Sequence, residues 1–443
     1  DRISDIKIKI MLNNKNIFSK KKILIYGLGK SGVSAFKNLK KENEIYLYDD
    51  KKIDNNIEIK KNLINYHKII KNIFDFIIIS PGININKCKL TSFLKKNRKK
   101  IHTDLDVFFS LYSNNKSITI TGTNGKSTTA KILYEVLKQQ KLDVRLVGNI
   151  GNAILLEKNI TNKTIFVIEA SSYQLDYSKI FKSNIAVILN ISPDHLERHK
   201  TLKNYIRAKF KLIKRQTKKD YAILNVNNPH IKGQVVSKKF LSSIIEVNKK
   251  INPSVLQKIN NKYFITDSNK ENLAFVIEAS KLLKITKENL FKVLNKFKGL
   301  KYRQEIIFKS KDLTIINDSK STSFSSSVSI LKSMSNVYWI VGGLAKKGDR
   351  FLLSKNDCKN FKAYIFGKNI KPFVKELKTK IKYESFICLK NLIEKIFLDI
   401  KKNQNYKHKV ILFSPAAASF DSFKNFEERG IYFDNLIKKI NAK

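Results

Sequence analysis

The feature that most constrains the fold is a glycine-containing loop between a short expected strand and an expected helix. The loop comprises Gly122, Thr123, Asn124, Gly125, Lys126, Ser127 and Thr128; residues 117–121 precede it, and a helix is expected to follow it as far as Gln139. Glycines let such a loop turn its N–H groups toward phosphate oxygens, and the helix N-terminus adds the positive end of its dipole. Lys126 would then reach the outer phosphates, and the Ser127 hydroxyl could bind Mg²⁺.

This context predicts a phosphate-binding loop, although Ile120 stands where a strict match to the general pattern has glycine. An ordinary strand-to-helix turn is the alternative, and the strand and helix expected on either side disfavour it. The loop does not distinguish a kinase, an NTPase motor, a switch GTPase or a ligase, because all of these use it.

The whole chain alternates short apolar runs with helix-forming segments, which predicts an α/β fold with parallel sheets. With 443 residues, the chain is too long for a single core. We expect three domains: a Rossmann-like domain over 1–112, a central phosphate-loop domain over 113–299, and a second Rossmann-like domain over 300–443. The expected strands are 23–26, 45–48, 76–79, 117–121, 165–169, 185–190, 221–225, 313–317, 337–341, 363–366 and 410–413. The expected helices include 31–41, 126–139, 202–215, 272–284 and 287–297.

Polar side chains follow two strands of the expected central sheet. Glu169 ends the run 165–168, and Asn190 to His195 follow the run that starts at 185. The carboxyl ends of parallel strands meet at the ligand-binding edge of a sheet, and Mg²⁺ prefers oxygen ligands. Glu169 is therefore a candidate metal ligand, and the position of His195 favours a functional role over that of an ordinary surface imidazole.

His195 and His199 are four residues apart, but the pattern is not that of a zinc protease. Such an enzyme needs glutamate directly after the first histidine on one helix, whereas Leu196 occupies that position and Pro193 limits a helix upstream. Zinc hydrolysis is disfavoured, and His199 is interpreted as an ordinary capped or surface histidine.

A second glycine-rich turn, Gly27 to Gly32, follows the first expected strand, and Asp49 ends the next one. This arrangement has the form of a dinucleotide-binding fingerprint. Alone it would suggest a nicotinamide-dependent enzyme. With a stronger ATP loop downstream, a second nucleotide-like ligand is the better interpretation.

Taken together, these motifs resemble the Mur ligases over nearly the full length. The resemblance rests on the phosphate loop and on runs at 27–32, 80–82, 148–151, 169–175, 194–198, 205–209, 317–322, 342–346 and 414–426. The last run is most similar to that of the family members that add D-glutamate. The resemblance implies ATP-dependent ligation of D-glutamate to UDP-N-acetylmuramoyl-L-alanine through an acyl phosphate, with ADP and phosphate as products, in peptidoglycan precursor synthesis. The implied cofactors are ATP and Mg²⁺.

The resemblance also assigns residues to ligands. The first domain would hold the uridine nucleotide through Lys30, Ser31, Asp49, Asp50 and Gly82, and Asn149 matches a muramoyl contact. Lys126, Glu169, His195 and Lys209 match catalytic positions, and Ser127, Glu169, His195 and Lys209 match metal ligands, the lysine if carbamylated. Asn269, Asn272, Arg303 and Asp318 match nucleotide contacts, while Lys320, Thr322, Lys346, Ser419 and Phe426 match positions around D-glutamate.

Three positions depart from the family pattern. Tyr302 and Ser268 stand where histidine is common, and Ser323 replaces a usual asparagine. These changes bear on the adenine contacts and on hydrogen bonding near D-glutamate.

The net charge of +50 is spread along the chain, and no basic stripe is interleaved with aromatic residues, so nucleic-acid binding is disfavoured. The three cysteines are widely scattered, which suits a reducing compartment, and we expect a cytoplasmic monomer without a membrane span. Met11 is a candidate natural first residue.

Three alternatives remain at this point: a nicotinamide-dependent oxidoreductase using the turn at 27–32, a nucleic-acid-stimulated ATPase, and another amide ligase of the Mur or folylpolyglutamate type. An absorbance change that depends on nicotinamide, ATPase stimulation by DNA or RNA, and a panel of acceptor substrates respectively test them.

Overall fold

The computed structural model describes residues 16–51, 57–247, 251–346, 348–403 and 407–441. Met11 and the start of the expected first domain lie outside these residues. The described residues divide into two compact units: unit 1 falls within 1–191, 198–250 and 274–293, and unit 2 within 192–197, 251–273 and 294–443. The expected three-domain boundaries remain a prediction. The α/β fold class is confirmed, because three separate, mainly parallel sheets are present.

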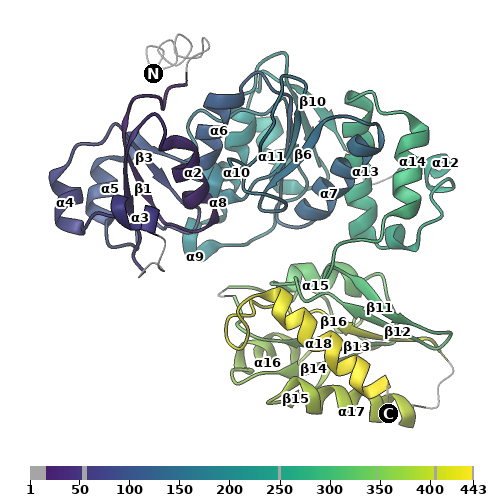
Figure 1. Ribbon diagram of the computed structural model, residues 1–443. Coiled ribbons are helices and arrows are strands. Elements are labelled where there is room, and N and C mark those ends of the chain that lie inside the picture. The colour runs from purple at the N-terminus through teal and green to yellow at the C-terminus, as the bar shows by residue number, and fades with distance from the viewer. Residues whose placement is uncertain (1–15, 52–56, 248–250, 347, 404–406, 442–443) are drawn as a thin grey trace. The chain divides into compact units, whose positions relative to one another are not determined.

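The first sheet of unit 1 is parallel and has the order β2-β1-β3-β4; Figure 1 labels β1 and β3 of this sheet. Its strands are β1 (Lys22–Tyr26), β2 (Glu44–Tyr48), β3 (Phe76–Ile79) and β4 (Ile101–His102). The accompanying helices are α2 (Lys30–Leu39), α3 (Ile57–Asn62), α4 (Tyr66–Lys71), α5 (Thr91–Lys96), η1 (Arg98–Lys100) and α6 (Asp104–Tyr112). β1 is buried along almost its whole length because helices cover a parallel sheet on both faces.

The central sheet of unit 1 is also parallel, with the order β10-β9-β8-β5-β7-β6. Its strands are β5 (Ser117–Thr121), β6 (Val144–Gly148), β7 (Ile165–Glu169), β8 (Ile185–Ile188), β9 (Tyr221–Leu224) and β10 (Ser243–Glu246). The helices are α7 (Lys126–Gln139), α8 (Ser172–Tyr177), α9 (Leu196–His199), α10 (Leu202–Lys214) and α11 (Pro229–Ser237). The predicted strand 185–190 ends at Ile188, because Asn190 turns its side chain to the phosphate loop.

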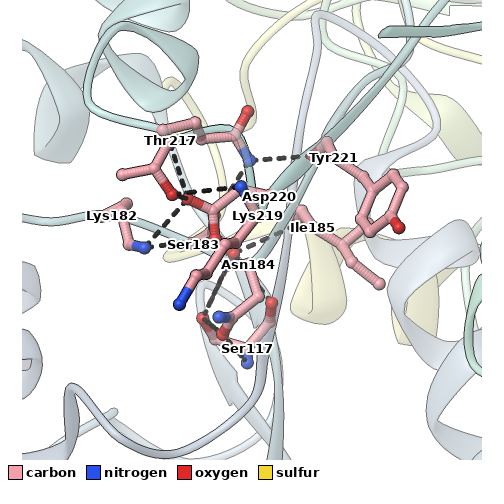
Figure 2. A network of polar contacts seen from close by, with 10 residues as sticks. Ser117, Lys182, Ser183, Asn184, Ile185, Thr217, Lys219, Asp220 and Tyr221 are labelled. Carbon is pink, nitrogen blue, oxygen red and sulfur yellow. Dashed lines mark hydrogen bonds and ion pairs between the residues drawn. The ribbon is translucent and has the colours of Figure 1, made fainter. Parts of the chain in front are cut away.

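Polar contacts hold together the amino-terminal ends of the central strands (Figure 2). The Asp220 carboxylate accepts hydrogen bonds from the Thr217 N–H at 2.7 Å and from the Lys182 ammonium at 2.9 Å. Between the neighbouring strands, the Asn184 amide oxygen accepts from the Ser117 N–H at 2.9 Å. These bonds fix the register at one end of the sheet, and the glycine-rich loop lies at the other end.

The third sheet belongs to unit 2 and has the order β11-β12-β16-β13-β14-β15. Its strands are β11 (Glu305–Lys309), β12 (Leu313–Asn317), β13 (Val337–Gly342), β14 (Phe361–Phe366), β15 (Lys382–Phe386) and β16 (Lys409–Phe413). Only β11, at one edge, pairs antiparallel among the described strands of this sheet. The helices are α15 (Phe324–Leu331), α16 (Lys371–Leu377), α17 (Leu389–Lys402) and α18 (Phe426–Asn441).

Four further helices precede this sheet: α12 (Pro253–Leu256), η2 (Lys262–Ile265), α13 (Asp267–Leu282) and α14 (Lys287–Lys296). The predicted helix 272–284 therefore begins earlier, at Asp267, and ends at Leu282.

Candidate active site

The phosphate loop connects β5 to α7 at the carboxyl edge of the central sheet. Gly125 occupies the N-cap of α7 with φ of 82°, a left-handed conformation that glycine adopts without steric cost. Asn190, beyond the end of β8, holds the loop from the side: its carbonyl accepts from the Thr123 N–H at 2.9 Å, and its amide oxygen accepts from the Asn124 N–H at 2.8 Å. The loop thus lies between a strand and a helix, as predicted, and Thr128 is buried in the first turn of the helix.

Two lysines point their ammonium groups at carbonyls of this loop. Lys126 donates to the carbonyls of Gly122 at 3.0 Å and Thr123 at 2.8 Å. Lys209, only 1% exposed on α10, donates to the Gly122 carbonyl at 2.8 Å and lies 4.7 Å from the centre of the Tyr205 ring. Both predicted catalytic lysines therefore converge on one loop, where positive charge attracts phosphate.

The predicted metal ligands Ser127 and Glu169 are in direct contact. The Ser127 hydroxyl donates to the Glu169 carboxylate at 2.5 Å, and Glu169 is 4% exposed. A hydroxyl and a buried carboxylate beside a phosphate loop are the oxygen donors that Mg²⁺ takes, so these residues fit the implied ion. Among the described residues, no group of three or more His, Cys, Asp or Glu side chains is arranged to hold a metal.

The other predicted ligands and contacts around this site are placed as follows. Asn149 follows β6, and its N–H donates to the Glu169 carbonyl at 3.1 Å. His195 lies in the segment assigned to unit 2, with φ of 54°, an uncommon conformation that costs energy and is concentrated at functional sites. Its imidazole lies 3.5 Å from Asp194 and 3.6 Å from Glu197. The relation of His195 to Glu169 remains a prediction.

The glycine-rich turn of the first sheet is closed by side chains from two neighbouring strands. Asp49 accepts from the Leu28 N–H at 2.6 Å, and the Ser80 hydroxyl donates to the Gly27 carbonyl at 2.5 Å. Lys30 and Ser31 begin α2 at this turn. One oxygen of Asp50 accepts from the Tyr26 hydroxyl at 2.8 Å, whereas the other is buried without a hydrogen-bond partner. The loops after β1 and β2 therefore contribute a helix N-terminus and a buried carboxylate oxygen, respectively.

In unit 2, the predicted nucleotide contacts gather near the end of β12. The Asn269 amide lies 3.4 Å from the Gln304 side-chain oxygen, and the Gln304 N–H donates to Asp318 at 3.1 Å. Asn272 is buried one helical turn beyond Asn269. Burial raises the pKa of the Asp318 carboxyl to about 7. Asp318 therefore changes charge near neutral pH.

A chain of buried hydroxyls leads away from Asp318. The Ser414 hydroxyl donates to Asp318 at 2.8 Å and lies 2.7 Å from the Ser327 hydroxyl, which in turn lies 2.8 Å from that of Ser321. The indole N–H of Trp339 donates to the Ser414 carbonyl at 2.8 Å. This chain joins the loop after β12 to the loop after β16.

The predicted amino-acid contacts come from these same two loops and from the loop after β13. The Lys320 ammonium lies 3.9 Å from the centre of the Phe426 ring, Ser419 is buried, and Lys346 forms an ion pair with Asp194. The other predicted members at this edge are Thr322, which is half-buried, and Arg303, which precedes Gln304.

Sequence reasoning missed Arg429, on α18. This guanidinium is fully buried and donates to the carbonyls of Ser319 at 2.7 Å and Ala417 at 2.9 Å. Burial lowers its pKa to about 10. Gln304 and Asn190 were likewise not assigned roles. Arginine in an amphipathic helix normally faces water, so only its position three residues after Phe426 could have drawn attention to Arg429.

The pattern of the Mur ligase middle domain matches residues 120–293. A UDP-N-acetylmuramoylalanine--D-glutamate ligase from Rickettsia bellii (strain RML369-C) is 33% identical to this chain, over 96% of the chain and 99% of the relative. One from Prochlorococcus marinus (strain MIT 9312) is 31% identical, over 97% of the chain and 99% of the relative.

Solved structures agree on the fold. MurF ligase from Thermotoga maritima in complex with ADP aligns with a TM-score of 0.57 at 15% identity, over 97% of this chain and 99% of that one. UDP-N-acetylmuramate-alanine ligase MurC from the same organism aligns with a TM-score of 0.53 at 17% identity, over 95% of this chain and 99% of that one.

The fold, the phosphate loop and these relatives define an ATP-dependent enzyme that forms amide bonds. The chain belongs to the Mur ligase family. No helix within the described residues combines the length and apolarity needed to cross a membrane.

Proposed function

We propose that this enzyme joins D-glutamate to UDP-N-acetylmuramoyl-L-alanine, with conversion of ATP to ADP and phosphate, in the cytoplasmic synthesis of peptidoglycan precursors. The observation that carries the proposal is the likeness to the D-glutamate ligase of Rickettsia bellii over almost the full length of both chains. The hydroxyl and aromatic contacts of the loop 414–426 support it, because that run is the one most similar to the D-glutamate-adding members of the family.

The reaction needs two balanced steps. The carboxylate of the L-alanyl group attacks the terminal phosphorus of ATP, which breaks the bond to ADP and gives an acyl phosphate. The amine of D-glutamate then attacks the acyl carbon, loses a proton, and displaces phosphate as the amide forms. Phosphoryl transfer depends mainly on positioning and on neutralising negative charge.

This chain's residues supply those effects at the phosphate loop. Lys126, which lies against the loop, would neutralise charge on the phosphates, and the loop N–H groups would orient them. Ser127 and Glu169 would hold Mg²⁺, which when bound offsets the charge of the phosphate oxygens. Asp318 and Asn269 would bind the nucleoside, and Lys320, Thr322, Lys346, Ser419 and Phe426 the amino acid.

The remaining assignments follow the same scheme. Residues 1–112 would bind the uridine nucleotide, 113–299 ATP, and 300–443 D-glutamate, in a monomer that binds no nucleic acid. His195 and a carbamylated Lys209 would complete the metal site. An unmodified Lys209 ammonium does not suit a cation, whereas a carbamate would add oxygen donors.

The direct test measures ADP release with each substrate omitted in turn. ADP release is expected only when UDP-N-acetylmuramoyl-L-alanine and D-glutamate are both present. ADP release that depends on neither substrate would exclude ligation. For the carbamate, Lys209→Ala is expected to lose most activity and to regain part of it with added short carboxylates. Full activity in that variant would refute a role for Lys209.

A further inference from the structure

Two neighbouring side chains on one short helix reach both ligand loops of unit 1. Arg198 and His199 are the last two residues of α9, which lies near α8 (Figure 1). Arg198 contacts the loop after β3, and His199 contacts Tyr205, which in turn contacts the phosphate loop. Neither side chain is used in the chemistry described above.

Arg198 donates to three consecutive carbonyls. Its guanidinium nitrogens lie 3.2, 3.4 and 2.5 Å from the carbonyl oxygens of residues 81–83. The same guanidinium lies over the rings of Tyr173 and Tyr177, at 4.7 and 5.3 Å from their centres. A planar cation stacked on two aromatic residues of α8 has a fixed orientation, so its donors fix the position of this loop.

The loop after β3 in turn contacts the glycine-rich turn. The Ser80 hydroxyl donates to the Gly27 carbonyl, and a side chain at Gly27 would lie 2.8 Å from the Ser80 Cβ. Gly82, whose carbonyl accepts from Arg198, is one of the expected uridine contacts. A change in the position of Arg198 would therefore move the loop after β3, which contains the expected uridine contact Gly82.

His199 connects the same turn of helix to the phosphate loop. His199 is 5% exposed, so it is not the surface histidine that the sequence suggests. Its Nε2 lies 3.0 Å from the Ser172 hydroxyl, and its ring centre lies 5.3 Å from that of Tyr205. The Tyr205 hydroxyl lies 3.1 Å from the Thr123 hydroxyl. The Tyr205 side chain thus contacts both Thr123 of the phosphate loop and His199 of α9.

We propose that Arg198 and His199 are positioning residues that couple nucleotide binding at the phosphate loop to binding of the uridine substrate. A shift of Thr123 on nucleotide binding is transmitted through Tyr205 and His199 to α9. Arg198 then moves the carbonyls of residues 81–83 with it. The identity of the two ligands rests on the proposed function, whereas the contacts themselves do not.

The coupling is measured as a ratio of two dissociation constants. Isothermal titration calorimetry gives the Kd of UDP-N-acetylmuramoyl-L-alanine for the full chain, without ADP and with saturating ADP. Coupling between two sites typically changes an affinity about 5- to 150-fold, so a ratio of about 5 or more is expected for the unaltered enzyme. The variants are Arg198→Lys, His199→Phe and, as the matched control, Arg207→Lys at an exposed position of α10.

Arg198→Lys keeps the charge but lacks the planar group that contacts three carbonyls, and His199→Phe keeps the ring but lacks Nε2. In both variants the ratio of the two Kd values is expected to lie within about twofold of one, which is below the range typical of coupled sites. His199→Phe should leave the Kd without ADP unchanged, whereas Arg198→Lys should raise that Kd about tenfold. Arg207→Lys should behave as the unaltered enzyme, and thermal unfolding confirms that each variant folds.

A ratio of one in the unaltered enzyme, an unchanged ratio in His199→Phe, or an equal loss in Arg207→Lys would each overturn the proposed coupling. No binding of the uridine substrate to the unaltered enzyme would instead overturn the proposed function. The two failures are therefore distinguishable.

Discussion

Asp106 in unit 1 and Asp318 in unit 2 are both buried aspartates, yet their pKa values shift in opposite directions. Hydrogen bonds to His102 and to Ser178 and its neighbours hold the pKa of Asp106 at about 2, although burial opposes this shift. Burial raises the pKa of Asp318 to about 7, because donors such as Ser414 and Gln304 are too few to offset it.

The difference lies in the donors around each carboxylate. Asp106 accepts from the Ser178 hydroxyl at 2.7 Å, from the N–H groups of residues 179–181 at 2.9–3.0 Å, and from His102 at 2.9 Å. Asp318 accepts from one N–H and one hydroxyl. Burial alone therefore does not mark a functional carboxylate; the number of donors separates a structural tie from a group that titrates near neutral pH.

The largest effect is expected from removing the Asp106 carboxylate, which accepts several buried hydrogen bonds. Asp106→Ala leaves His102 and several buried N–H groups without their acceptor, and should lower the free energy of unfolding by about 3–5 kcal/mol. Urea denaturation measures the loss. The control Glu58→Ala removes an exposed partner of Lys40, and should cost less than about 1 kcal/mol. Similar losses in the two variants would contradict the comparison.

Replacing Asp318 should raise the free energy of unfolding at high pH, whereas replacing Asp106 lowers it. Because its pKa is raised in the folded chain, Asp318 stabilises the fold below pH 4 relative to pH 8, and this contribution is lost as pH rises through about 7. A shift of this size corresponds to about 4 kcal/mol, less about 1–2 kcal/mol for an acceptor that an amide nitrogen cannot replace.

Asp318→Asn should therefore be more stable than the unaltered chain at pH 8, by about 2–3 kcal/mol, and less stable at pH 4. Denaturation of both proteins at the two pH values measures this. The exposed Asp312→Asn serves as the control, with no change expected at either pH. A variant that is less stable at pH 8 would show that Asp318 is ionised without penalty.

The free energy of unfolding at acid pH tests the same comparison. The depressed pKa of Asp106 contributes stability that is fully present above pH 4 and is lost as pH falls through about 2. The stability difference between the unaltered chain and Asp106→Ala should shrink by roughly 2 kcal/mol between pH 5 and pH 2. Denaturation curves across that range test the expectation, and a constant difference would refute it.

The smallest effect is expected in the hydroxyl chain beside Asp318. Ser327→Ala removes the contact with the Ser414 hydroxyl but leaves the bond from Ser414 to Asp318, so the loss should be about 1 kcal/mol. The pH dependence assigned to Asp318 should stay unchanged. A changed pH dependence would show that the hydroxyls act on Asp318 as one network.

Sequence predicted the interior of the sheets better than their edges. The strands that were missed in the central and third sheets, β6, β10, β11 and β15, all lie at sheet edges. Polar residues interrupt them, as in the Lys382–Phe386 segment, because an edge strand is covered less completely and so carries less of the apolar pattern. Buried strands such as β13 and β16 are mostly apolar, and the sequence predicts their bounds to within a residue.

The site was predictable where a local motif carries the chemistry. The phosphate loop needs glycines, a lysine and a serine in one run, and the structure brings Ser127 to Glu169 as expected. The environments of Asp106, Arg198 and Arg429 could not be predicted, because each depends on donors or acceptors that are distant in sequence. The same holds for the pKa of Asp318, which follows from its burial against β16.

The contact between Trp339 and the Ser414 carbonyl has a spectroscopic consequence. Trp339 is the only tryptophan of the chain and is fully buried in β13. Excitation at the red edge of protein absorbance therefore samples unit 2 alone, beside the loop that leads to Asp318. Intrinsic emission provides a built-in reporter of that edge of the third sheet, and comparison with circular dichroism of the whole chain resolves the melting of unit 2 from that of unit 1 without any label.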